Sequence, residues 1–326
     1  MEVGASQKAP EGWNGLVDSD EAGTFFQRSD WPDVLIEGGI GAEAVYLSLT
    51  SGGRPLAGLP AVAIRRGPVR ILASMPLGTY GGPVLGPHAP PDAVTVLLDA
   101  FRRLASRHDV GAAHLMDESG RLEAPPPGFS AHTENAHRVR LDRPFEDVWS
   151  SFRPSARNKV RKARKAGVVV RRASSETDFL IYADMLDECV QRWGERSVFG
   201  RSFFSALSRL SPDVVQMWLA EHEGTAIGGD LNFTLHGRIM NWGNVSRTSA
   251  RKLAPNNLLH ATAMEEGARE GAVVYDLGSS AGIESVDAFK SAFGTTLVEL
   301  RMYSVRKWWF SGVRRVARLR EHGRSG

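Results

Sequence analysis

The last third of the chain predicts a helix between two strands, with a basic loop at the start of that helix. Pro255 has the fixed φ that suits a first helical turn, and good helix formers continue to Arg269 before Gly271 supplies a left-handed stop. The apolar run 272–275 predicts a buried strand, and residues 238–245 predict the strand that precedes the loop. The order strand, loop, helix, strand is typical of an α/β unit, so this pattern constrains the fold strongly.

The loop 246–254 lies directly before the helix. Free backbone N–H groups and the helix dipole at such a position favour a phosphate or a developing oxyanion. The alternative is that the loop is only a connection. Three basic residues of the loop are candidate phosphate ligands: Arg247, Arg251 and Lys252. The candidate substrate-binding residues nearby are Trp242, on the preceding strand, and Asn256 and Asn257, in the first helical turn.

Four motifs in this region carry a family resemblance. Gly228-Gly229-Asp230 lies on a predicted strand, Pro255-Asn256-Asn257-Leu258-Leu259 opens the helix, and Tyr275-Asp276-Leu277-Gly278 and Phe289-Lys290 follow. Together they resemble the second half of the Fem-type aminoacyltransferases, which are similar in fold to the GNAT acyltransferases. The resemblance extends to residues 153–170 and, in the first half, to Trp31 and to residues 77–83.

This resemblance implies an α/β (α+β) fold with two tandem GNAT-like subdomains and an amide-forming acyltransferase activity. A length of 326 residues suits two domains. In the first half, predicted strands over 44–49, 56–64 and 69–73, a helix over 93–108 and a strand over 112–116 give a similar α/β order. We place the first subdomain at 1–144, the second at 145–303 and a basic amphipathic helix at 304–326. No long heptad stretch occurs between Phe179 and Trp218, so we expect no coiled-coil arm.

The resemblance also implies roles for single residues. Lys290 matches a lysine that family members place beside the reacting groups and the transfer RNA terminus, and its expected role is charge stabilisation. The alternative is a structural ion pair. Asp117 resembles an acidic position that faces the acceptor amine, with a turn residue as the alternative. Arg196 resembles an arginine that contacts acceptor phosphate, with a surface arginine as the alternative. Tyr80, in the 77–83 segment, is a further candidate substrate-binding residue.

Amide formation needs an unprotonated amine close to an activated carbonyl and donors for the oxyanion, and it requires no covalent nucleophile. Asp230 and Asp276 are further candidate proton acceptors, because burial raises the pKa of a carboxyl group. The single cysteine, Cys189, has no local histidine partner and is interpreted as a core thiol, with a nucleophile as the alternative. The nine histidines show no paired ligand spacing, so we predict no metal site.

The acyl donor stays open at this stage. GNAT enzymes that use coenzyme A usually carry the loop R/Q-x-x-G-x-G/A, and residues 246–254 contain no glycine. This favours aminoacyl-tRNA as the co-substrate, without a resident cofactor. Acyl-coenzyme A is the alternative, because Gly78, Gly81 and Gly82 form a second candidate loop that a structural turn explains equally well. Residues 32–37 lack the lysine of the peptidoglycan-precursor enzymes, so the expected acceptor is an amine of a peptide, a cell-wall precursor or a small molecule.

Two basic segments suggest further partners. Arg157, Arg161, Arg164 and Lys165 share one predicted helix face and are candidate tRNA or phosphate contacts, with a solvated face as the alternative. The 304–326 helix interleaves arginines with aromatic residues, which suits RNA or the surface of an anionic membrane, or else a packed terminal helix. A non-catalytic RNA- or membrane-binding protein is therefore a third interpretation. No apolar run approaches the roughly 20 residues of a membrane span and no signal-peptide core is present, so we expect a cytoplasmic protein.

Overall fold

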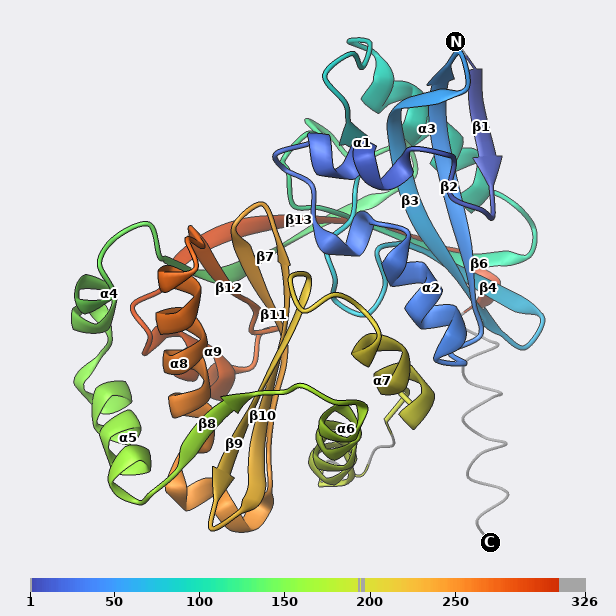
Figure 1. Cartoon of the computed structure of the whole chain (residues 1–326). Coiled ribbons are helices and arrows are strands. Elements are labelled where there is room, and N and C mark those ends of the chain that lie inside the picture. The colour runs from blue at the N-terminus through green and yellow to red at the C-terminus, as the bar shows by residue number, and fades with distance from the viewer. Residues whose placement is uncertain (1, 193, 195–196, 311–326) are drawn as a thin grey trace, which may run out of the picture. The chain divides into compact units, whose positions relative to one another are not determined.

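The computed structural model describes residues 2–192, 194 and 197–310 and divides the chain into two compact units (Figure 1). Unit 1 comprises residues 1–36, 41–133 and 300–326. Unit 2 comprises residues 37–40 and 134–299. Two of the crossings between the units, at residues 133/134 and 299/300, fall within strands.

Unit 1 is built on the sheet order β1-β2-β3-β4-β6-β13, with β5 paired to β3. Strands β4 and β6 pair in parallel, and the remaining pairs are antiparallel. Its elements are β1 (Glu2–Ser6), α1 (Trp13–Ser19), the 3-10 helix η1 (Phe25–Gln27), α2 (Asp30–Glu37), β2 (Ala42–Ser51), β3 (Arg54–Arg66), β4 (Val69–Ser74), β5 (Val84–Leu85), α3 (Ala93–Ala105), β6 (Val110–Asp117) and β13 (Thr296–Arg306).

The alternation of side chains along β2 explains how helices cover both faces of the unit 1 sheet. Tyr46 packs against Trp13 of α1, with the ring centroids 4.9 Å apart. The next residue, Leu47, belongs instead to a core that contains Leu97 and Phe101 of α3. Consecutive strand residues point to opposite faces, so α1 and α3 lie on opposite sides of the sheet.

Unit 2 is built on the sheet order β7-β12-β11-β10-β9-β8. Strands β11 and β12 pair in parallel, and the other neighbours pair antiparallel. Its elements are β7 (Ser130–Arg140), α4 (Phe145–Ser151), α5 (Pro154–Lys165), β8 (Val169–Arg172), α6 (Glu176–Gln191), α7 (Arg201–Ser208), β9 (Val215–His222), β10 (Thr225–Leu235), β11 (Arg238–Ser246), the 3-10 helix η2 (Thr248–Leu253), α8 (Pro255–Arg269), β12 (Val274–Ser279) and α9 (Glu284–Ser291).

Two glycines of β10 let helices approach the unit 2 sheet closely from both sides. A Cβ at Gly228 would lie 3.2 Å from a methyl carbon of Leu259 in α8, and a Cβ at Gly229 would lie 2.6 Å from the ring of Tyr182 in α6. Helices α8 and α6 therefore cover opposite faces of the sheet (Figure 1). Packing at full atomic density explains the Gly228-Gly229 motif.

Both units repeat one topological plan. In unit 1 the parallel strands β4 and β6 are joined through α3, and in unit 2 the parallel strands β11 and β12 are joined through α8. A helix that links two parallel neighbours is the α/β unit predicted for each half. The prediction of an α/β (α+β) chain with two subdomains of similar strand order is confirmed.

The unit boundaries differ from the predicted subdomains 1–144 and 145–303. The change to unit 2 occurs at Glu134, within β7, and the return to unit 1 occurs at Leu300, within β13. The physical reason is strand pairing, since Arg301–Arg306 pair with β6. The predicted terminal helix 304–326 overlaps β13 over its first three residues, and residues 311–326 lie outside the described part of the chain.

The segment between Phe179 and Trp218 contains most of α6 and all of α7. As far as this segment is described, these helices of 16 and 8 residues form no coiled-coil arm. Within residues 2–192, 194 and 197–310, no helix combines the length and apolar character needed to cross a bilayer.

Candidate active site

Strands β11 and β12 pair with each other only over their first three residues. Arg238–Met240 pair with Val274–Asp276, whereas β11 continues to Ser246 and β12 to Ser279. The register between β10 and β11 shifts by one residue at Trp242, which forms a bulge. Bulges bend a strand and re-aim its side chains. Beyond Met240 and Asp276 the two parallel strands no longer pair with each other, although β11 stays paired with β10 and Ser279 of β12 with β7. Several candidate residues lie near this separation of the two strands.

Lys290 on α9 directs its ammonium group at the end of β12. Its Nζ donates a hydrogen bond of 2.7 Å to the carbonyl oxygen of Ser279. Burial lowers the pKa of Lys290 to about 8, although the carboxylates of Asp276 and Asp287 act to raise it. The Lys290 ammonium is therefore mostly charged at neutral pH, and it is a stronger acid than an ordinary lysine.

A buried histidine holds α9 against β7. The ring nitrogens of His137 lie 3.0 Å from the carboxylate of Asp287 and 3.0 Å from the hydroxyl of Thr295. His137 is fully buried, whereas the side chain of Asp287 is half-exposed. Sequence reasoning missed His137, because its partners are far away in the chain and the surrounding residues show no motif.

Asp276 on β12 is buried, and both of its carboxylate oxygens accept hydrogen bonds. One accepts a hydrogen bond of 2.7 Å from the guanidinium of Arg138, and the other accepts 2.8 Å from the backbone N–H of Gly278. These contacts shape the end of β12, where Gly278 has a φ of +70° that favours glycine.

Asp230 is fully buried and lies at the centre of a polar network around the bulge. Four side chains donate to its carboxylate at 2.7–3.0 Å: Asn232, Asn241, Asn244 and Tyr275. His260 of α8 extends the network, since its Nδ1 lies 3.0 Å from the Tyr275 hydroxyl. Burial lowers the pKa of His260, while Asp230 acts to raise it. These hydrogen bonds tie β10, β11 and β12 together around the bulge.

The first residues of the loop 246–254 already interact with other residues of unit 2. The backbone N–H of Thr248 donates a hydrogen bond of 2.7 Å to the carboxylate of Glu188 on α6. Arg247 donates to the carbonyl of Ala226 at 2.9 Å and lies 3.5 Å from Glu188. A carboxylate therefore takes the place where a loop amide would meet an anion. Arg251 and Lys252 are exposed on η2.

The other candidate substrate-binding residues of unit 2 are Trp242, Asn256, Asn257 and Arg196. Trp242 packs its ring against Phe199 and Phe203, with centroids 4.9 and 5.7 Å apart. In the first turn of α8, Asn257 is buried, and the Oδ1 atom of Asn256 is buried without a hydrogen-bond donor in the described residues. Arg196 lies outside the described residues, so its role stays a prediction.

The predicted basic helix is α5, and its arginines contact neighbouring groups of unit 2. Arg157 donates to the carbonyl of Ser150 at 2.7 Å, Arg164 lies 3.2 Å from Glu265, and the guanidinium of Arg161 lies 5.8 Å from the Trp149 ring centroid. The exposed lysines of this helix form no ion pair with any described residue: Lys159, Lys162 and Lys165. The side of α5 that carries these lysines is available to phosphates.

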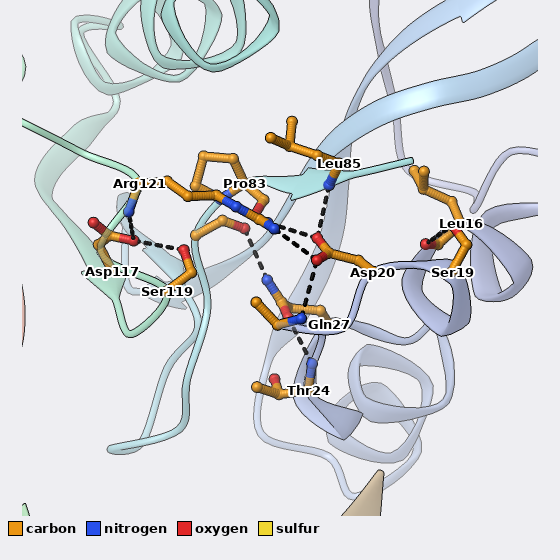
Figure 2. A network of polar contacts seen from close by, with 12 residues as sticks. Leu16, Ser19, Asp20, Thr24, Gln27, Pro83, Leu85, Asp117, Ser119 and Arg121 are labelled. Atoms are coloured by element: carbon orange, nitrogen blue, oxygen red, sulfur yellow. Dashed lines mark hydrogen bonds and ion pairs between the residues drawn. The ribbon is translucent and has the colours of Figure 1, made fainter. Parts of the chain in front are cut away.

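Unit 1 contains the remaining candidates in a network of internal hydrogen bonds (Figure 2). Asp117 is buried, and its carboxylate accepts bonds from Ser119 and from the backbone N–H groups of Arg121 and Leu122 at 2.8–3.2 Å. These contacts are those of a turn residue. Asp117 and Lys290 belong to different units, so the hypothesis that Asp117 faces the acceptor amine stays a prediction.

The glycine-rich segment 77–83 of unit 1 is held by packing and by side chains of the same unit. The amide nitrogen of Gln27 lies 3.3 and 3.1 Å from the carbonyl oxygens of Gly81 and Gly82. A Cβ at Gly81 would lie only 2.2 Å from the backbone of Ser74. Tyr80 is buried. The structural-turn interpretation explains these glycines, because no side chain fits at Gly81.

Cys189 is buried in α6, and its thiol lies 3.5 Å from the carbonyl oxygen of Ser246. The guanidinium of Arg192 donates to its sulfur at 2.9 Å. The burial of Cys189 agrees with the interpretation as a core thiol.

Comparisons with known proteins agree with this geometry. Residues 150–291 match the family described as an acetyltransferase (GNAT) domain. Among solved structures, the chain is similar to FemX, with a TM-score of 0.65 and 15% identity over 92% of this chain and 97% of that chain. It is similar to the C-terminal domain of an Agrobacterium fabrum protein assigned as a lysylphosphatidylglycerol synthetase, with a TM-score of 0.62 and 13% identity over 95% of each chain. It is also similar to a tandem GNAT protein from the clavulanic acid biosynthesis pathway, with a TM-score of 0.57 and 15% identity over 94% of this chain and 98% of that chain. A search of curated proteins finds no match.

The matched domain lies within unit 2 and contains the bulge, the end of β12 and Lys290. Residues 150–291 therefore form an acyltransferase domain of the GNAT type. The fold of the chain is similar to that of FemX and of a tandem GNAT protein, as the resemblance to the Fem-type enzymes predicted.

Proposed function

We propose that the protein is an amide-forming aminoacyltransferase, which moves an aminoacyl group from aminoacyl-tRNA to an amine of a peptide, a cell-wall precursor or a small molecule. The observation that carries this proposal is the position of Lys290. Its ammonium group lies at the end of β12, beyond the point where the parallel strands of the GNAT domain stop pairing with each other. Lys290 is partly exposed as a residue.

The chemistry needs a positive group near the ester carbonyl. When the acceptor amine attacks this carbonyl, negative charge develops on its oxygen, and a preorganised donor stabilises that charge. The Lys290 ammonium, with a pKa of about 8, is charged at neutral pH and donates more strongly than an ordinary lysine. Lys290 therefore suits oxyanion stabilisation and proton donation to the leaving oxygen.

The loop before α8 supports a donor other than coenzyme A in unit 2. It contains no glycine, and the carboxylate of Glu188 already accepts the N–H of Thr248. A pyrophosphate at this place would meet that negative charge. Exposed lysines on α5, together with Arg251 and Lys252 on η2, which contacts α5, provide positive charge for an RNA backbone instead.

A transfer assay tests the proposal. The purified protein is incubated with a pool of tRNA charged with labelled amino acids and with a metabolite extract, and amide products are followed by mass spectrometry. Vesicles of phosphatidylglycerol form a further acceptor arm, because one structural neighbour carries the name lysylphosphatidylglycerol synthetase. This lipid offers a hydroxyl group and no amine, so labelled ester in this arm alone would contradict amide formation. Label that moves from tRNA to an amine supports the proposal, and label that stays on tRNA in every arm contradicts it.

The Lys290→Met variant tests the observation itself. We expect kcat to fall by roughly 100- to 1,000-fold, because the variant keeps the length of the side chain and loses the charge. Lys8→Met is the matched control, since Lys8 is exposed in unit 1 and forms no ion pair with a described residue. Full activity of Lys290→Met would remove this residue from the mechanism.

Acyl-coenzyme A as donor is a second candidate, favoured by the description of the matched family as an acetyltransferase domain. A parallel arm with labelled acyl-coenzyme A decides between the donors. Amide product in that arm alone would assign coenzyme A chemistry to the chain.

A further inference from the structure

The group that accepts the amine's proton is the missing part of the site. A general base must come within hydrogen-bond reach of the amine, directly or through one hydroxyl or water. The three aspartates predicted from the sequence are Asp117, Asp230 and Asp276, with exposures of 1%, 0% and 1%. Their carboxylates are engaged by the donors described above, so each is better suited to hold structure than to accept a proton.

Glu134 on β7 is a fourth carboxylate, and it lies beside Lys290. Its Oε2 accepts a hydrogen bond of 2.6 Å from the hydroxyl of Ser279, the residue whose carbonyl accepts the Lys290 ammonium. Glu134 and Ser279 are both partly exposed, unlike the three aspartates. An acid, a hydroxyl and a base thus meet at the last residue of β12.

The hydroxyl of Ser279 has one site that no described residue uses. A serine hydroxyl has one donor and two acceptor lone pairs. Its donor is used by Glu134, and one lone pair accepts the backbone N–H of Ala281 at 2.9 Å. The second lone pair can accept an N–H from an amine. The arrangement therefore connects an incoming amine to Glu134 through a single hydroxyl.

We propose that Glu134, acting through the Ser279 hydroxyl, is the general base that takes the proton of the acceptor amine. This inference rests on the proposed function. The amine nitrogen attacks the ester carbonyl, the C–N bond forms and the C–O bond to the ribose breaks. The proton lost by nitrogen passes to Ser279 while the Ser279 proton passes to Glu134. The leaving ribose oxygen takes a proton from the Lys290 ammonium. At the end of the reaction Glu134 has gained one proton and Lys290 has lost one, so transfer of this proton from Glu134 to Lys290 restores the enzyme without another reactant.

The Glu134→Gln variant separates this role from a structural one. Glutamine keeps an oxygen that accepts the Ser279 hydroxyl, but it cannot accept a proton. We expect kcat to fall by about 100-fold or more with little change in KM, and Ser279→Ala to show a similar loss. In Glu134→Ala, added formate is expected to restore activity in proportion to its concentration, which a purely structural role would not produce.

The control is Glu146→Gln, an exposed carboxylate on α4 of the same unit with no ion-pair partner in the described residues. Circular dichroism and thermal unfolding check that each variant is folded. Activity of a folded Glu134→Gln variant close to that of the wild type would overturn this inference and leave the proposed function standing. No transfer by the wild-type protein in any tRNA arm would contradict the proposed function, and the inference with it.

Discussion

At the scale of single residues, the candidate site depends on one lysine whose charge is sensitive to its neighbours. Burial disfavours the Lys290 ammonium, while Asp276 and Asp287 stabilise it, and the balance leaves its pKa at about 8. His260 is the other titratable group coupled to Lys290, from α8. The site therefore works with a lysine that is charged below about pH 8 and neutral above it.

This pKa predicts the alkaline side of the rate profile. Activity that requires the ammonium falls as the pH rises through about 8, because roughly nine-tenths of Lys290 is protonated at about pH 7 and roughly one-tenth at about pH 9. In Asp287→Asn one of the two stabilising carboxylates is lost, so the decline is expected at lower pH. Asparagine still forms a hydrogen bond with His137, which keeps α9 in place. The measurement is kcat against pH.

The matched control for this profile is Glu284→Gln, an exposed change in the first turn of the same helix. We expect its profile to coincide with that of the wild type. An Asp287→Asn profile that also coincides with the wild type would show that the alkaline decline reports a group other than Lys290.

At the scale of elements, the start of α6 is fixed by one buried carboxylate. Asp178 accepts two hydrogen bonds from the guanidinium of Arg171 on β8 at 2.7 and 3.0 Å, and it accepts the backbone N–H of Ser174. The hydrogen bonds from Arg171 lower the pKa of Asp178 to about 2, although burial acts to raise it. This pair ties α6, which carries Tyr182 and Glu188, to the unit 2 sheet.

The lowered pKa predicts a pH-dependent stability. Since the folded pKa lies below the unfolded value of 3.8, the contribution is complete above about pH 4 and is lost as the pH falls through about 2. We expect Asp178→Asn to lower the free energy of unfolding by about 2 kcal/mol at neutral pH, and the difference from the wild type to shrink in acid. Urea unfolding at several pH values measures this.

Asp184→Asn on the same helix is the control, because its pair with Arg201 is exposed and such pairs contribute about 0–1 kcal/mol. A difference between Asp178→Asn and the wild type that is constant from neutral to acidic pH would contradict the assignment to this ionisation.

The same scale shows what the sequence could predict. The strands and helices around the site were predictable, because apolar runs, Pro255 and the left-handed Gly271 are local signals that the structure confirms. The pairs Glu134–Ser279 and His137–Asp287 join residues 145 and 150 positions apart. Such contacts depend on strand pairing between distant segments, which leaves no pattern in either segment alone. Lys290 was predictable only because its motif resembles a family.

At the scale of the whole molecule, the unit boundaries could not be predicted from the sequence for the same reason: they depend on pairing between strands that are far apart in the chain. Composition and length indicate two domains, but they do not show that unit 2 is inserted into unit 1. Residues 301–306 complete the sheet of unit 1 beside β6, although more than half of the chain separates them from it. The closing strand of unit 1 thus comes after unit 2 in the sequence.

This arrangement predicts that unit 1 depends on the end of the chain. A protein that stops at Glu299 loses six residue pairs with β6, the buried Tyr303 and the Phe310 ring that packs against Val69 and Ala112. We expect amide hydrogen exchange in β4 and β6 to become fast, while β9–β11 of unit 2 keep their protection, because unit 2 has its own core. A protein that stops at Phe310 keeps these contacts and is expected to exchange like the full chain. Equal protection of β6 in the two shortened proteins would show that unit 1 folds without its last strand, and transfer activity measured on both would then report whether unit 2 alone carries the chemistry.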